Sequence, residues 1–239
     1  MIVLRSLLFN SVYFGLTALL MIPGLFIRLF APRHALPLAM FWARMSLAAL
    51  RLICCIRLTI SGLENLPRDG AALIASRHES AFDTMVWLTL VPRACYVLKV
   101  ELLRVPFFGG LLRPAGMIPV DRDGGATAMR KLMRDGIRAA AEGRQIVIFP
   151  EGTRGESNTL LTLHPGVAAL ALSTRLPVIP VVTDSGRLWG RRSFRKHAGT
   201  IQICILPPLP TDLKRPELMA RLQASLREGL INIGTGQPL

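Results

Sequence analysis

The chain has 239 residues, of which 51% are hydrophobic and 18% are charged, and its mean hydropathy is +0.43. This composition excludes a disordered chain, and it argues against an ordinary soluble domain because one core cannot hide so much apolar surface. Lysine and arginine number 29 against 15 aspartates and glutamates, a formal net charge of +14. An apolar and basic chain indicates an anionic partner at a membrane at least as readily as a nucleic acid.

The N-terminal 63 residues contain six arginines and no acidic side chain. Between Arg5 and Arg28 lie 22 uncharged residues. As a helix this segment would be about 33 Å long, which is enough to cross the hydrocarbon core of a bilayer. Pro23 and Gly24 are expected to kink or break that helix near its end.

A second apolar stretch, residues 36–60, is interrupted by Arg44 and Arg51, which stand seven positions apart. A helix would place both on one face, as in an interfacial amphipathic helix. We therefore interpret residues 1–60 as a two-helix membrane anchor that dips into one leaflet or spans with its first helix. Two buried helices of a soluble domain are the alternative. The arginines favour the inner membrane, with the remaining residues, 61–239, facing the cytoplasm.

From Ser61 onward, short apolar runs alternate with helical patterns. The predicted strands are 71–76, 95–100, 116–122, 145–150, 177–183 and 200–210, and the predicted helices are 84–91, 125–142, 166–174 and 216–230. This alternation predicts an α/β domain with a largely parallel central sheet flanked by helices. The four cysteines have neither metal spacing nor a disulfide framework, and the histidines are scattered, so no metal site is expected.

Polar residues follow the predicted strand 71–76, where chemistry gathers in parallel sheets. His78 and Asp83 can meet only if the histidine lies in the loop and the aspartate in the first helical turn, since a continuous helix separates them by about 140°. The carboxylate would then hold one imidazole nitrogen and leave the other as a general base. Polar residues at this spacing are common, so a purely structural role is the alternative.

A second polar group follows the most strand-like run of the chain. Glu151, Thr153 and Arg154 project from a tight turn there, and arginine is suited to gripping phosphate. Lys99 and Arg122 leave two other strand ends. Three cations converging from three strand ends would form a pocket for a phosphate monoester, whereas a solvated turn with a Glu–Arg pair is the alternative.

Residues 186–197 place five basic side chains around Trp189 and Phe194. Basic groups interleaved with aromatic rings occur in nucleic-acid binders and equally at membrane interfaces. Because an apolar anchor is present, we favour lipid headgroups, acyl-carrier protein or coenzyme A phosphates as the partner, and we expect no nucleic acid. A solvated loop is the alternative.

Four short blocks stand in a fixed order: His78–Asp83 as H-x4-D, 116–122 as GMIPVDR, 149–154 as FPEGTR and 178–181 as VIPV. They match the blocks of the 1-acylglycerol-3-phosphate acyltransferase family, the PlsC-like lysophosphatidic acid acyltransferases, which the chain resembles over residues 62–210. Each block is moderately specific alone, and four in order make a strong signal.

The resemblance implies a membrane-bound enzyme that moves a fatty acyl group from acyl-CoA or acyl-carrier protein to the sn-2 hydroxyl of 1-acylglycerol-3-phosphate, giving phosphatidic acid. It implies no cofactor beyond the acyl donor. His78 would take the hydroxyl proton, and Asp83 would orient the imidazole. The remaining implied roles are phosphate binding by Arg154, Arg122 and Lys99 and substrate positioning by Glu151, Gly152 and Thr153.

One position departs from the family pattern. Members usually place lysine or arginine just before the glycine that opens the helix at 166–174, and this chain has His164 there. A histidine supplies a weaker cation or none, so the acceptor could be another lysolipid, such as a lyso-ornithine lipid or a headgroup-bearing lysophospholipid. A non-catalytic, basic membrane-surface binding protein is a further alternative.

Overall fold

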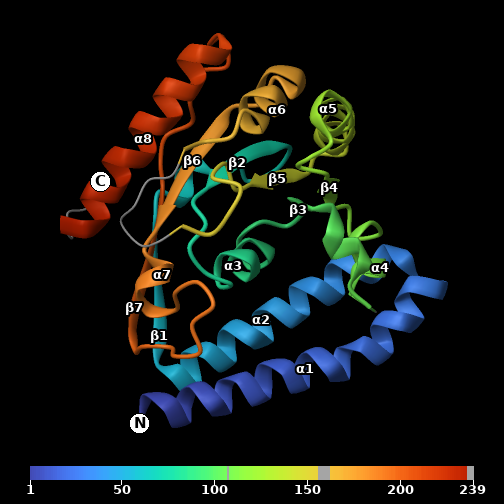
Figure 1. The fold of residues 1–239 in the computed structure, drawn as a ribbon, viewed down its shortest axis with the longest axis vertical. Coiled ribbons are helices and arrows are strands. Elements are labelled where there is room, and N and C mark those ends of the chain that lie inside the picture. Colours follow the sequence, from blue (N-terminus) through green and yellow to red (C-terminus); the bar gives the residue numbers. More distant parts are fainter. Residues whose placement is uncertain (107, 156–161, 236–239) are drawn as a thin grey trace.

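A computed structural model describes residues 1–106, 108–155 and 162–235 (Figure 1). Within these ranges a single sheet has the strand order β1-β7-β6-β2-β5-β3-β4. The strands are β1 (Ile56–Ser61), β2 (Ala72–Ser76), β3 (Ala94–Lys99), β4 (Ile118–Val120), β5 (Gln145–Ile148), β6 (Val178–Thr183) and β7 (Gly199–Ile205). Neighbouring strands are parallel except β6 and β7, which are antiparallel. The predicted α/β fold with a largely parallel sheet is confirmed.

Helices cover both faces of the sheet (Figure 1). One hydrophobic core contains side chains of α1 (Ile2–Phe30), α2 (Ala35–Cys54), α3 (Asp83–Leu90), α4 (Gly109–Leu112) and α7 (Ser185–Leu188). The other contains side chains of α5 (Gly125–Ala141), α6 (Gly166–Thr174) and α8 (Arg215–Thr235). Short 3₁₀ helices lie at Pro32–His34, Leu63–Asn65 and Val100–Arg104.

Strand β2 shows why its sequence is a continuous apolar run. Ala72 and Ile74 belong to the first core, and Leu73 and Ala75 belong to the second. Side chains alternate between the faces of a strand, so a strand covered on both faces needs apolar residues at every position. Burial on both sides therefore explains the pattern that predicted a parallel sheet.

The N-terminal helices bear on two expectations. The sequence predicts that Pro23 and Gly24 kink or break α1, and the helix continues through Pro23 without a break. Helix α2 ends at Cys54, because Cys55 adopts a left-handed conformation with φ of 56° and residues 56–61 pair with β7. The stretch 36–60 is thus a helix followed by a strand, two elements that an apolar run alone does not separate.

Both helices are long and apolar enough to cross a membrane, by length and composition. Only 6% of the most apolar window of α1 and 17% of that of α2 are buried. A core helix of a soluble protein is mostly buried, so these exposed apolar faces are the surface expected of a membrane protein. The division into an anchor, 1–60, and a domain, 61–239, stays a prediction.

The basic segment 186–197 does not form one exposed patch. Lys196 is only 3% exposed, and its Nζ lies 4.9 Å from the centroid of the Trp189 ring. Nζ donates to Asn10 Oδ1 at 2.6 Å, and the backbone N–H of Lys196 donates to Ser6 Oγ at 2.9 Å. Lys196 therefore links helix α1 to the loop before β7 through these hydrogen bonds. The arginines of the segment are more exposed.

Candidate active site

Strands β2 to β6 run in the same direction, so their carboxyl ends meet at one edge of the sheet. The loop after β2 carries His78, the loop after β5 carries Arg154, and Ser185 follows β6. Strand β3 ends at Lys99. Ligands of parallel α/β sheets bind at this edge, and the predicted site residues gather there.

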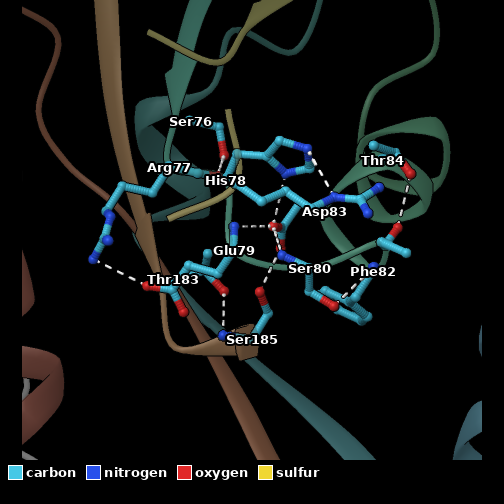
Figure 2. Close-up of polar contacts among 12 residues, drawn as sticks. Ser76, Arg77, His78, Glu79, Ser80, Phe82, Asp83, Thr84, Thr183 and Ser185 are labelled. Carbon is cyan, nitrogen blue, oxygen red and sulfur yellow. Dashed lines mark hydrogen bonds and ion pairs between the residues drawn. The ribbon is translucent and has the colours of Figure 1, made fainter. Parts of the chain in front are cut away.

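His78 and Asp83 are in contact as the sequence predicted (Figure 2). His78 lies in the loop, Asp83 opens α3, and Nδ1 of the ring is 3.1 Å from Oδ2 of the carboxylate. The same Oδ2 accepts from the backbone N–H groups of Glu79 and Ser80 at 2.7 and 2.8 Å. These donors hold the carboxylate facing the imidazole.

The other ring nitrogen of His78 faces Arg154, whose Nε is 3.3 Å from Nε2. A guanidinium can only donate, so Nε2 accepts and the ring proton sits on Nδ1, toward Asp83. Phe149 stacks on the ring with centroids 4.1 Å apart. The imidazole is thus held at both nitrogens and on one face, and the Nε2 lone pair, which a general base needs, accepts from Arg154.

Glu151 is buried in the protein interior, next to the loop that carries His78. Its carboxylate accepts from Arg77 Nε and from the backbone N–H of His78, each at 3.2 Å. Arg77 also pairs with Glu79 at 3.0 Å, and the three charged side chains are fully buried. The network joins the loops after β2 and β5 and fixes the backbone of His78. A role of Glu151 toward the substrate stays a prediction.

The three predicted phosphate-binding cations line one cavity. Arg154 is half-buried, whereas Arg122 and Lys99 are exposed. Lys99 is paired with Glu101 at 3.0 Å, a contact at the surface that contributes little energy and leaves the ammonium free to exchange partners. Cations from three strand ends therefore face the same cavity.

Gly152 and His164 are packed against each other at the same cavity. Gly152 has φ of +66°, a conformation that favours glycine, and a Cβ there would lie 2.6 Å from His164 Cδ2. The backbone N–H of His164 donates to Pro150 O at 2.7 Å. Thr153 is exposed beside them. The position at which the sequence departs from the family pattern thus borders the candidate site.

The cavity has a volume of about 1080 Å³ and a largely apolar wall. The N-terminal helices supply much of it, with Tyr13, Phe14, Thr17, Leu20 and Met21 from α1 and Leu38, Ala39 and Trp42 from α2. His78 and the cations lie on the same wall. This combination suits a molecule with a long apolar chain and an anionic group.

Tyr96 also lines the cavity. Its ring stacks on Phe149, which in turn stacks on His78. Burial raises the pKa of the Tyr96 phenol well above its ordinary value, so it stays protonated at physiological pH. Tyr96 therefore does not compete with His78 as a proton acceptor at this cavity. In the described part of the chain, no three His, Cys, Asp or Glu side chains gather as metal ligands would.

The acyltransferase family model matches residues 57–184. The chain belongs to the acyltransferase family. A 1-acyl-sn-glycerol-3-phosphate acyltransferase from Pseudomonas aeruginosa is 34% identical over 181 residues, covering 76% of this chain and 70% of that protein. The corresponding alpha enzyme from Bos taurus is 25% identical over 192 residues, covering 80% and 67%.

The crystal structure of the 1-acyl-sn-glycerophosphate (LPA) acyltransferase PlsC from Thermotoga maritima has the same fold, with a TM-score of 0.79, 20% identity and 98% of both chains covered. The agreement extends over the N-terminal helices as well as the sheet. Together with the family match, it confirms the resemblance that the four sequence blocks indicated.

The sequence patterns did not identify two residues of the site. Arg77 precedes the histidine of the H-x4-D block, and a charged residue at the end of a buried strand is a signal for an internal ion pair. Ser185 follows β6, whose carboxyl end points to the same edge of the sheet. Its hydroxyl lies against Asp83, a contact that no local pattern reveals.

Proposed function

We propose that this acyltransferase moves a fatty acyl group from acyl-CoA or acyl-carrier protein to the sn-2 hydroxyl of 1-acylglycerol-3-phosphate, giving phosphatidic acid. One observation carries the proposal: His78, which is in contact with Asp83, and three cations lie on the wall of one apolar cavity. The names of the relatives, 1-acyl-sn-glycerol-3-phosphate acyltransferases, support the same acceptor.

His78 Nε2 accepts the proton of the acceptor hydroxyl as its oxygen attacks the thioester carbonyl carbon. The new C–O bond forms, the C–S bond breaks, and the proton passes to the departing thiolate. Asp83 holds the Nδ1 proton and stabilises the imidazolium between these events. The acceptor is itself the nucleophile, so this route needs no acyl-enzyme.

Arg154, Arg122 and Lys99 bind the acceptor phosphate, and the acyl chains lie along the apolar wall. Arginine matches the geometry of phosphate oxygens, whereas lysine acts as a point charge. Gly152 and Thr153 shape the turn that presents Arg154, and Glu151 holds the loop of His78 in register with it. Headgroup and chain are thus recognised by different parts of one cavity.

Helices α1 and α2 hold the enzyme in the membrane that contains its acceptor and product. Their exposed apolar faces and the arginines around them support this placement. By the same charge distribution, we assign the enzyme to the inner membrane with the sheet on the cytoplasmic side, where acyl-CoA and acyl-carrier protein are found.

The test is an acyl-transfer assay with the purified full chain in lipid nanodiscs. Oleoyl-CoA and oleoyl-acyl-carrier protein are offered with lysophosphatidic acid, lysophosphatidylcholine or a lyso-ornithine lipid. We expect transfer to lysophosphatidic acid, lost in His78→Ala and retained in the control His34→Ala. Transfer to a different lysolipid would overturn the acceptor assignment. No transfer by protein that inserts normally into nanodiscs would overturn the enzymatic role of this site.

A further inference from the structure

We propose that Ser185 is a positioning residue for acyl transfer, acting through Asp83 on the orientation of His78. The inference rests on the proposed function and extends it by one side chain. In its simplest form, the hydroxyl of Ser185 holds the carboxylate oxygen that His78 does not touch.

The central observation is a hydrogen bond of 2.6 Å from Ser185 Oγ to Asp83 Oδ1 (Figure 2). Ser185 is 0% and Asp83 2% exposed, so water does not compete for the contact. An O–H···O⁻ bond of this length is in the range of charge-assisted hydrogen bonds, which are about twice as strong as neutral ones. The two residues are 102 positions apart in the chain.

The two oxygens of Asp83 have separate sets of donors. Oδ2 receives His78 Nδ1 and the backbone N–H groups of Glu79 and Ser80. Oδ1 receives Ser185. Rotation about the Cβ–Cγ bond moves both oxygens, so a donor at each oxygen resists this rotation more strongly than donors at Oδ2 alone. Ser185 thus helps to fix the plane of the carboxylate and the direction from which His78 is held.

Ser185 is itself fixed by the end of β6. Its backbone N–H donates to Thr183 Oγ1 at 3.1 Å, and the next N–H, of Gly186, donates to Glu79 Oε2 at 3.0 Å. Asp184 is tied to β7 through the N–H of Gln202 at 2.7 Å. The serine therefore reaches Asp83 from a rigid strand end, as a residue that positions a reacting group must.

A serine that only stabilises the fold would give a different result on substitution. Loss of the bond would then lower the melting temperature while folded protein kept its kcat. A positioning role instead lowers kcat and leaves the KM for the lysolipid unchanged, because the phosphate and the chain bind elsewhere on the cavity. The split between kcat and KM separates the two cases.

The experiment compares Ser185→Ala, Ser185→Cys and the control Ser193→Ala, a partly exposed residue whose hydroxyl donates within its own loop, to Arg195 O. We expect kcat of Ser185→Ala to fall about 10- to 100-fold, the equivalent of one hydrogen bond to a charged group. Ser185→Cys, close in size but a weak donor, should be intermediate, and Ser193→Ala should match wild type. If the alanine variant fails to fold, the cysteine variant decides.

A double-mutant cycle sharpens the result. In an Asp83→Ala background, Ser185→Ala should cause no further loss of kcat, since the carboxylate it orients is gone. Additive losses would overturn the inference, and so would a folded Ser185→Ala variant with kcat within about twofold of wild type.

A second readout does not depend on turnover. NMR of isotope-labelled histidine, assigned with His78→Gln, should show the Nδ1–H form of His78 in wild type and a mixture of tautomers in Ser185→Ala. An unchanged His78 signal would overturn the inference. If wild type transfers no acyl group but the signal changes, the proposed function fails, whereas the orientation of His78 by Ser185 through Asp83 stands.

Discussion

Arg154 donates from Nε to Nε2 of His78, the ring nitrogen that accepts a proton in the proposed acyl transfer. In the free protein the base is therefore covered by one of the cations proposed to bind phosphate. An acceptor with a phosphate monoester would draw Arg154 to itself and uncover Nε2. An acceptor without one would leave the contact in place, so recognition of the headgroup and readiness of the base are linked through a single side chain.

Replacement of Arg154 by alanine tests this link. We expect the KM for lysophosphatidic acid to rise about 10- to 100-fold, since one charge-assisted phosphate contact is lost. The preference for lysophosphatidic acid over lysophosphatidylcholine should fall by a similar factor. Steady-state kinetics with both acceptors measures this, with the surface variant Arg221→Ala as control. Equal losses for both acceptors would show that Arg154 does not distinguish a phosphate monoester from a diester.

Asp83→Asn should reduce kcat about 10²- to 10⁴-fold. The amide can present an N–H where the carboxylate accepted from Glu79 and Ser80, and it cannot stabilise the imidazolium as a charge does. Single-turnover acyl transfer measures the chemical step directly. Asp69→Asn, at an exposed turn, is the matched control. Activity close to wild type in Asp83→Asn would remove Asp83 from the mechanism.

Arg77→Met should destabilise the protein by about 3–5 kcal/mol, because it leaves Glu79 and Glu151 buried without their cation. Chemical denaturation followed by circular dichroism measures the free energy of unfolding. Adding Glu79→Gln and Glu151→Gln should recover part of the loss, since the buried charges are then gone. A loss below about 1 kcal/mol for Arg77→Met would show that the network is not a structural centre.

Lys196 gives a prediction of pH dependence. Burial lowers its pKa below the ordinary value of 10.5, so between the folded-state pKa and 10.5 the unfolded chain binds the proton more tightly. Stability therefore rises with pH in that window relative to Lys196→Met, which has no titrating group there. Unfolding free energies of both proteins at neutral pH and at about pH 10 measure the difference. A pH-independent difference would contradict the lowered pKa.

Local patterns predicted the elements that one stretch of chain determines. Helix α6 has the predicted bounds, and the strands after residue 61 begin and end within one or two residues of the apolar runs, except that β7 ends five residues before its run does. Strand β1 was not predicted, because an apolar run next to an apolar helix carries no boundary signal. The reversed direction of β7 depends on how distant strands pair, which periodicity does not record.

The same limit applies to the site. His78 and Asp83 were predictable because five positions separate them and a loop-to-helix turn brings them together. Ser185 was not, since its contact exists only because β6 lies beside β2 in the sheet. The interpretation of Lys196 as part of a basic surface is wrong, because aromatic rings and helix α1 enclose it.

Helices α1 and α2 form part of the cavity wall, and this affects the free energy of binding an acyl chain. Other faces of the same helices carry exposed apolar side chains suited to lipid. An acyl chain entering from the bilayer would exchange lipid neighbours for side chains of equal polarity without passing through water. The hydrophobic effect then contributes little to capture, because lipid tails are as apolar as the wall. If the enzyme acts as proposed, selection among membrane lipids would therefore rest on Arg154 and the other cations of the cavity, which would meet the polar headgroup of the acceptor.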